Sequence, residues 1–159
     1  MPTLHVITFI AAPITRVFDL ARSIDAHMAS TDGTGERAVA GVTTGLIDLG
    51  QSVTWEARHL GIRQHLTVRI SEMTRPTSFE DEMVSGAFKS MHHRHVFVFK
   101  GDGTEMIDVF SFEAPLGILG RTAERLFLKA YLHRFLVSRA LVLKRMAESD
   151  EWQQYGIGA

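Results

Sequence analysis

The sequence of 159 residues contains no cysteine and only four prolines. The lack of cysteine excludes disulfides, zinc–thiolate sites and thiol catalysis, and it favours a reducing cytoplasm as the location. No apolar run approaches the ~20 residues that a membrane-spanning helix needs. The N-terminus lacks the basic stretch of a signal peptide. We therefore expect a cytoplasmic protein without an integral membrane segment.

Strong charge of either sign is also missing, because the net charge is −1. This balance argues against a nucleic-acid partner. No Gly-Lys-Ser/Thr sequence marks a P-loop, and Gly33-x-Gly35 lacks the third glycine of a dinucleotide fingerprint, so no cofactor is expected. With 45% apolar and 22% charged residues, the chain predicts one folded domain over residues 1–149. A tail, 150–159, follows, in which Trp152 and Tyr155 are available to dock.

The order of hydrophobic patterns predicts an α+β fold. An opening strand is followed by two short helices, about six strands in a meander and one long helix without Gly or Pro after Gly120. Strands are expected at residues 4–11, 36–40, 52–59, 62–73, 77–85, 91–99 and 104–113, and helices at 14–22, 25–30 and 116–149.

The clearest hairpin turns at Leu60-Gly61. If its two strands pair around this turn, Trp55 lies opposite Leu66 and Val53 lies opposite Val68. One face of the hairpin is then apolar and the other solvated, as in an antiparallel sheet covered on one side. For the next strand we expect Phe79 opposite Ile70 and Glu80 opposite Arg69.

Several short motifs stand out along the chain. They are Ala12-Pro13-x-x-x-Val17-Phe18, Asp81-Glu82, Gly86-Ala87-Phe88, His93-x-His95-x-Phe97, and Asp108 ahead of Ala114-Pro115-Leu116-Gly117. With these motifs the chain resembles the START-like (SRPBCC) superfamily and its helix-grip fold, in which a curved antiparallel sheet wraps a long C-terminal helix. The resemblance covers residues 3–149 and is closest to the bacterial ligand-binding and polyketide-cyclase-like branch. It implies a deep apolar cavity between the sheet and the helix but fixes no catalytic residue.

Four polar residues are predicted to face inward with aromatic neighbours. Alternate residues of a strand share a face, so Asp81, His93, His95 and Asp108 point to the same side as Phe79, Phe97 and Phe110. A buried carboxylate needs a partner, and an imidazole provides one. The cluster is open to three interpretations: an internal network that sets strand register, polar contacts for a ligand, or acid–base catalysis. Metal binding by His93-x-His95 is a fourth, but no third ligand stands at a fixed spacing, so we expect no metal.

The first functional hypothesis is that the protein holds a small hydrophobic ligand between the sheet and the long helix. The alternative is a polyketide cyclase/aromatase-like enzyme with candidate catalytic residues His93, His95, Asp81 and Asp108. The expected ligand-binding residues are Trp55, His59, Asp81, Met83, His93, His95, Phe97, Phe99, Met106, Asp108, Phe110, Leu126 and Ala130.

The long helix carries two apolar stripes on opposite sides, both at helical spacing. The first is Leu119, Ala123, Leu126, Ala130, Val137 and Leu141, and the second is Leu128, Leu132, Phe135, Val142 and Met146. We expect the sheet and the short helices to cover both stripes, with a homodimer or partner interface as the alternative. The basic residues of the helix predict a solvated face or, as a third function, contact with an acidic partner or anionic lipid. These basic residues are Arg121, Arg125, Lys129, Arg134, Arg139, Lys144 and Arg145.

Overall fold

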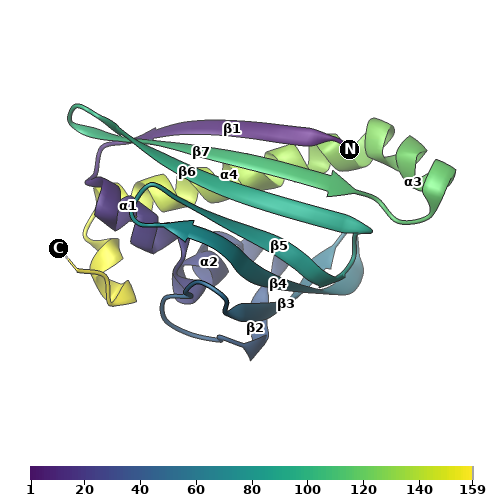
Figure 1. Cartoon of the computed structure of the whole chain (residues 1–159), viewed down its shortest axis with the longest axis horizontal. Coiled ribbons are helices and arrows are strands. Elements are labelled where there is room, and N and C mark those ends of the chain that lie inside the picture. Colours follow the sequence, from purple (N-terminus) through teal and green to yellow (C-terminus); the bar gives the residue numbers. More distant parts are fainter. Residues whose placement is uncertain (159) are drawn as a thin grey trace.

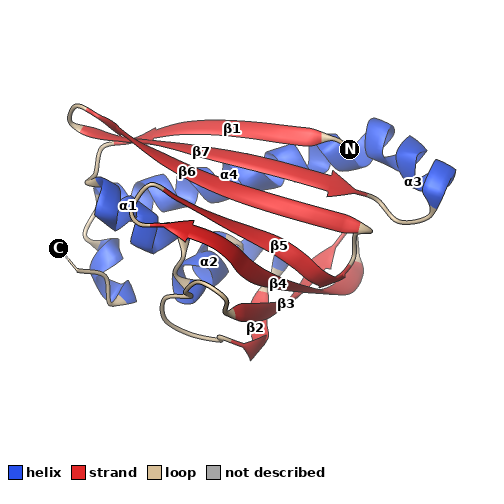
Figure 2. Cartoon of the chain, viewed as in Figure 1, coloured by secondary structure: helices blue, strands red, loops and turns tan. Residues whose placement is uncertain are grey.

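A computed structural model describes residues 1–158, without the side chains of residues 120, 121 and 123–125. It has the predicted order of one strand, two short helices, further strands and a C-terminal helix (Figures 1 and 2). The strands are β1 Thr3–Ile10, β2 Arg37–Gly41, β3 Ser52–His59, β4 Ile62–Thr74, β5 Ser78–Gly86, β6 Ser90–Lys100 and β7 Gly103–Glu113. The helices are α1 Ile14–Ala21, α2 Ile24–Ser30, η1 Asp32–Thr34, α3 Gly117–Ala123, the π-helical η2 Glu124–Leu128, α4 Lys129–Glu148 and η3 Glu151–Tyr155.

The seven strands form one antiparallel sheet in the order β1-β7-β6-β5-β4-β3-β2. Helix α4 runs along one face of this sheet and contacts β1, α1 and α2 (Figure 1). The strands therefore have one face toward the helices and one toward solvent. The predicted α+β class is confirmed, including the two short helices after the first strand.

The predicted β3–β4 register is confirmed, but the β4–β5 register is wrong. Trp55 pairs with Leu66 and Val53 with Val68, as expected. In β4–β5, Ile70 pairs with Asp81 rather than with Phe79. The difference begins at the turn, where the strands stay paired as far as Thr74–Ser78, so that Phe79 lies opposite Met73. The register shift at Ser71 then changes the offset by one residue, and the shift near Val68 reverses that change. The complementary pair on the outer face is consequently Arg69–Glu82, at 2.7 Å.

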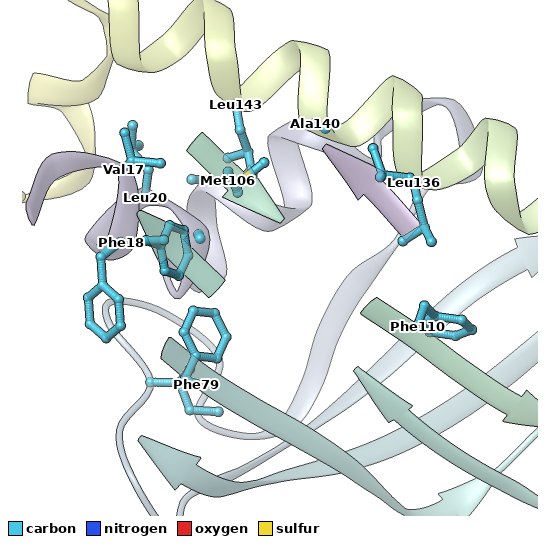
Figure 3. Close-up of a cluster of buried hydrophobic side chains, with 14 of the residues drawn as sticks. Val17, Phe18, Leu20, Phe79, Met106, Phe110, Leu136, Ala140 and Leu143 are labelled. Carbon is cyan, nitrogen blue, oxygen red and sulfur yellow. The ribbon is translucent and has the colours of Figure 1, made fainter. Parts of the chain in front are cut away.

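A cluster of aromatic rings in the core lies under α1. Phe18 meets the edges of the Phe79 and Phe97 rings, with centroids 5.6 and 5.4 Å away. Leu143 of α4 and Met106 of β7 fill the same region, whereas Leu136 points toward Phe110 further along the sheet (Figure 3). Burial of each such apolar side chain contributes roughly 1.5–3 kcal/mol to the free energy of folding. The aromatic cluster thus fills one end of the space between the sheet and the helices, and the core continues from there along the sheet.

The C-terminal helical segment differs from the prediction in the burial of its first stripe. The second stripe packs inward, with Leu132 and Met146 buried. In the first stripe, however, Leu119, Leu126 and Leu141 are exposed by 77%, 64% and 56%. The prediction that the sheet and the short helices cover both stripes is thus wrong. The side chain of Ala123, which also belongs to the first stripe, lies outside the described part of the structure. Helix α3 extends past the strand ends, where no sheet can cover it (Figure 1). A homodimer at this face stays a prediction.

The basic residues of the helix do not share one solvated face. Arg139 is buried, at 5% exposure, so its assignment to that face is wrong. Lys144 donates to the Phe9 carbonyl and pairs with Glu148. The side chains of Arg121 and Arg125 lie outside the described residues. Contact with an acidic partner or anionic lipid stays a prediction.

The C-terminal tail folds back on the domain. The Arg16 guanidinium lies 4.1 Å from the ring centre of Trp152 in η3. Trp152 and Tyr155 both pack against the core, as their aromatic character allows. The last residue, Ala159, lies outside the described part of the chain. No helix among the described residues combines the length and apolarity needed to cross a membrane.

Candidate functional site

A cavity of about 210 Å³ lies between the sheet and α4. Strands β3 and β4 supply one wall, the β5–β6 connection and β7 another, and η2 with α4 the cover. Most of the wall is apolar, as in ligand pockets generally. The apolar wall residues are Trp55, Ala57, Leu60, Leu66, Val68, Ala87, Phe88, Met91, Phe110, Pro115, Leu128, Leu132, Phe135 and Leu136.

Behind one wall, Asp108 of β7 holds two histidines of β6. Asp108 Oδ1 accepts a hydrogen bond from His93 Nε2 at 3.1 Å. The same oxygen lies 2.7 Å from His95 Nδ1, in a close but poorly aligned contact. Strand pairing places His95 opposite Asp108, and the period of two puts His93 on the same face. All three are buried, so the cluster predicted from the sequence exists.

The charges of this cluster follow from its contacts. Burial opposes ionisation of Asp108, but the bonds from His93 and His95 outweigh it and hold the pKa of this carboxyl far below its usual range. Burial also disfavours a charged His95, yet Asp108 and Asp81 raise its pKa. Burial and the charge of His95 lower the pKa of His93. The network thus favours a carboxylate, one imidazolium and one neutral imidazole.

Asp81 of β5 connects this network to the cavity. It pairs with His93 across β5–β6 and lies 3.7 Å from His95 Nε2. Burial opposes its ionisation, but the contacts with His95 and His93 lower its pKa. Asp81 and His93 both line the cavity, whereas His95 and Asp108 lie behind them. Two titratable side chains, Asp81 and His93, therefore reach the cavity, with His95 and Asp108 in contact behind them.

Asp81, His93 and His95 each offer a ligand atom within 4.8 Å of the others. Two imidazoles and a carboxylate are a known donor set for divalent transition metals. Asp108 already engages one nitrogen of each imidazole, which leaves one nitrogen on each for another partner. These residues could hold a metal ion only if it replaced the contact between Asp81 and His95.

A second polar group, missed in the sequence, lines the cavity from three other elements. His27 of α2 stacks on Trp55, and its Nε2 lies 3.3 Å from Glu36 Oε1. Arg139 of α4 completes the group. Burial lowers the pKa of His27; burial opposes ionisation of Glu36, but His27 outweighs it and lowers the pKa of that carboxyl. No motif links these residues, since they are brought together only by packing of α2 and α4 beside β2.

At the cavity margin, His59 of β3 meets Tyr131 of α4. His59 Nδ1 and the Tyr131 hydroxyl are 2.7 Å apart, and the two rings pack edge to face. Burial lowers the pKa of His59. This contact joins the sheet to the helical cover across the cavity. Both side chains are half-buried cavity-wall residues.

The expected ligand-binding residues divide into three groups. Trp55, His59, Asp81, His93 and Phe110 line the cavity. His95 and Asp108 support that wall from behind. The remaining six do not line the cavity: Phe97 and Met106 fill the core, Met83 packs beside it, and Phe99, Leu126 and Ala130 are exposed.

The placement of Phe99, Leu126 and Ala130 on the cavity wall was therefore wrong. Phe99 follows the inward alternation of β6, but it stands near the β6–β7 turn, which projects beyond the neighbouring strands (Figure 1). Leu126 and Ala130 lie on the outer side of the helical segment, where Leu128 and Leu132 take the inner positions. Residues two apart on a helix point in very different directions, so a choice between two stripes decides which residues face the cavity.

No protein-family model and no curated protein matches the sequence. Solved structures do match. TTHA0849 from Thermus thermophilus has a TM-score of 0.76 and 18% identity over 92% of this chain and 97% of its own. The Zhui aromatase/cyclase from Streptomyces sp. R1128 has a TM-score of 0.74 and 13% identity over 92% of this chain and 93% of its own. A START superfamily protein from Mycobacterium smegmatis has a TM-score of 0.69 and 13% identity over 92% of this chain and 97% of its own. At these identities the likeness shows the fold.

Proposed function

Since the chain has the START-like (SRPBCC) helix-grip fold, we propose that it binds a small apolar or aromatic molecule in the cavity between the sheet and α4. The observation that carries the proposal is the cavity of about 210 Å³ with its largely apolar wall. A cavity of roughly 150 Å³ holds benzene, so this one has room for a substituted single ring or a short chain. The polar groups on the wall would orient the ligand, as a few polar groups do in most pockets.

Native mass spectrometry of freshly purified protein tests this proposal. We expect a bound species of low mass that is released on gentle activation. Ala57→Phe places a ring into the cavity from β3 and should abolish the bound mass, whereas Ala40→Phe on the exposed β2 should retain it. Binding that survives Ala57→Phe in a folded protein would contradict a ligand at this site.

Acid–base catalysis is the second candidate, and the wall position of Asp81 and His93 favours it. A neutral imidazole supported by a buried carboxylate is suited to remove a proton. One structurally similar protein is named an aromatase/cyclase. The scheme is that His93 accepts a proton from a carbon next to a ligand carbonyl, while Asp108 holds the imidazole in place.

Deuterium exchange at the methyl group of acetophenone, followed by NMR in D₂O, tests this second function. The protein should accelerate exchange over buffer, and His93→Asn should remove most of the acceleration. His92→Asn, on the outer face of β6, is the matched control and should keep it. Exchange at the buffer rate, with acetophenone bound, would contradict catalysis but leave ligand binding intact.

A further inference from the structure

Arg139 is a buried charge without a close charged partner. The residue is 5% exposed, and Nη2 donates to the Ala21 carbonyl at 3.4 Å, a weak contact. Nε has no hydrogen-bond partner. Among the described residues, no carboxylate lies within the 4.0 Å of an ion pair with Arg139. Because a buried donor normally has a partner, Nε has an unmet requirement in a side chain that lines the cavity.

Glu36 presents the opposite requirement on the same wall. Its Oε1 faces His27, but Oε2 is buried without a hydrogen-bond partner. Although burial opposes it, the lowered pKa of Glu36 keeps the group a carboxylate that accepts hydrogen bonds and donates none. The cavity wall thus offers a charged donor on α4 and a charged acceptor beside β2. These two groups are too far apart to satisfy each other.

The charge of the wall disfavours an anionic ligand. Glu36 and Asp81 both have lowered pKa values and face the cavity as carboxylates, and among the described wall residues Arg139 alone opposes them with a guanidinium. Lowered pKa values leave His27, His59 and His93 neutral at pH 7. An incoming carboxylate would therefore meet a net negative wall, whereas a neutral dipolar group meets a donor and an acceptor.

We propose that Arg139 and Glu36 form a donor–acceptor subsite for a neutral, ring-sized ligand that carries both a carbonyl and a hydroxyl group. The inference rests on the proposed ligand binding and adds the chemical class of the ligand. The carbonyl accepts from Arg139 and the hydroxyl donates to Glu36. The ring lies against the apolar wall formed by Trp55, Leu132 and Leu136.

A smaller void of about 50 Å³ adjoins Arg139, His27 and His95, and it is large enough for a water molecule. A water there is the competing explanation, because it could satisfy Arg139 Nε without any ligand. The bound water and the donor–acceptor subsite predict different ligand affinities. Only the donor–acceptor subsite makes binding depend on the carbonyl and hydroxyl groups of the ligand.

Isothermal titration calorimetry at pH 7 with five matched probes tests the proposal. The probes are 4-hydroxyacetophenone, with both groups; acetophenone, with the carbonyl only; 4-ethylphenol, with the hydroxyl only; ethylbenzene, with neither; and benzoate, an anion. We expect 4-hydroxyacetophenone to bind most tightly and the loss of either group to weaken binding about tenfold. Benzoate should bind more weakly than acetophenone.

Substitutions assign the two preferences to their residues. Arg139→Met should bring 4-hydroxyacetophenone and 4-ethylphenol to similar affinity, and Glu36→Met should do so for 4-hydroxyacetophenone and acetophenone. Arg134→Met, on the exposed side of α4, and Glu72→Met, on β4, are matched controls that should preserve both ratios. If either cavity variant fails to fold, the ratios measured on the unaltered protein decide the question.

Equal affinity for the four neutral probes would overturn the donor–acceptor subsite while the proposed ligand binding stands. Tightest binding of benzoate would overturn it in favour of an anion site at Arg139. Failure of all five probes to bind would remove the proposed function, and this inference with it.

Discussion

The imidazole of His27 stacks on the indole of Trp55, with ring centroids 4.0 Å apart and 21° between the ring planes. Both rings line the cavity, so α2 contributes to a wall that otherwise belongs to the sheet. The contact also places a titratable group directly on a fluorophore. Trp152, the other tryptophan, lies against Arg16 at the opposite end of the chain.

The first prediction concerns the fluorescence of Trp55. Burial lowers the pKa of His27, so the imidazole is neutral at pH 7 and gains its proton only below pH 6.5. In the Trp152→Phe protein, where only Trp55 emits, we expect fluorescence to be quenched as the pH falls below 6.5. His27→Gln should remove this transition. A transition above pH 6.5, or one that persists in His27→Gln, would contradict the stacking.

The second prediction is that Asp108→Asn destabilises the fold. Asp108 is buried between two histidines, and loss of its charge leaves their nitrogens without a charged acceptor. Breaking a buried pair from one side costs about 3–5 kcal/mol. Urea unfolding at pH 7 measures this cost, and Asp102→Asn in the exposed β6–β7 turn provides the control.

The ionisation of Asp108 also makes the stability of the fold depend on pH in the acid range. Its folded pKa lies below the ordinary value of 3.8, so the stabilisation is present above pH 3.8 and is lost as the pH falls below it. Asp108→Asn should flatten this acid limb. A loss of less than about 1 kcal/mol at pH 7 would show that the network contributes little to stability.

The third prediction gives His95 the opposite pH dependence. Despite burial, Asp108 and Asp81 raise the folded pKa of His95 above 6.5. Its stabilisation is therefore fully present below pH 6.5 and is lost as the pH rises through the raised folded pKa. The difference in unfolding free energy between the unaltered protein and His95→Gln should shrink from pH 6 to pH 9. A difference that grows with pH would reverse the assigned charge.

The fourth prediction concerns Gly41, which ends β2 beside a bulge between Ala38 and Ala40. Gly41 has φ +73°, and an added Cβ would collide with the Ser52 carbonyl. We expect Gly41→Ala to cost about 1–3 kcal/mol or more, since strain in this region adds to the collision. Gly33→Ala meets nothing within 4 Å and should change stability by less than about 0.5 kcal/mol. Equal effects of the two substitutions in urea unfolding would contradict the bulge geometry.

Much of the fold could be predicted because it depends on local patterns. The turn at Leu60-Gly61 and the alternation around it determined the pairing of Trp55 with Leu66. The inward direction of Asp81, His93 and Asp108 followed from aromatic residues that share their strand faces. The alternation of side chains along a strand gives the face of each residue within that strand. A wrong register between two strands therefore leaves the predicted faces unchanged.

The β4–β5 register could not be predicted in the same way. Alternation gives the face of each residue but not how close to the turn the two strands stay paired, and here they are paired as far as Thr74–Ser78. The register shift at Ser71 leaves no mark in the alternation either. Phe99 shows a second limit: its direction followed from the pattern, but its exposure depends on where the covering helices end. Leu126 shows a third, because two apolar stripes of similar quality compete for one sheet.

The sequence by itself determined the order of elements, the faces of the strands and the His–Asp cluster, since each follows from a short-range period. Only the tertiary structure decided that Arg139 is buried and that Glu36 and His27 share its cavity. These three residues are far apart in the chain, and their meeting depends on how α2 and α4 pack beside β2. A basic residue on a helix has the same local pattern whether it meets water or a cavity; the elements packed around it make the difference.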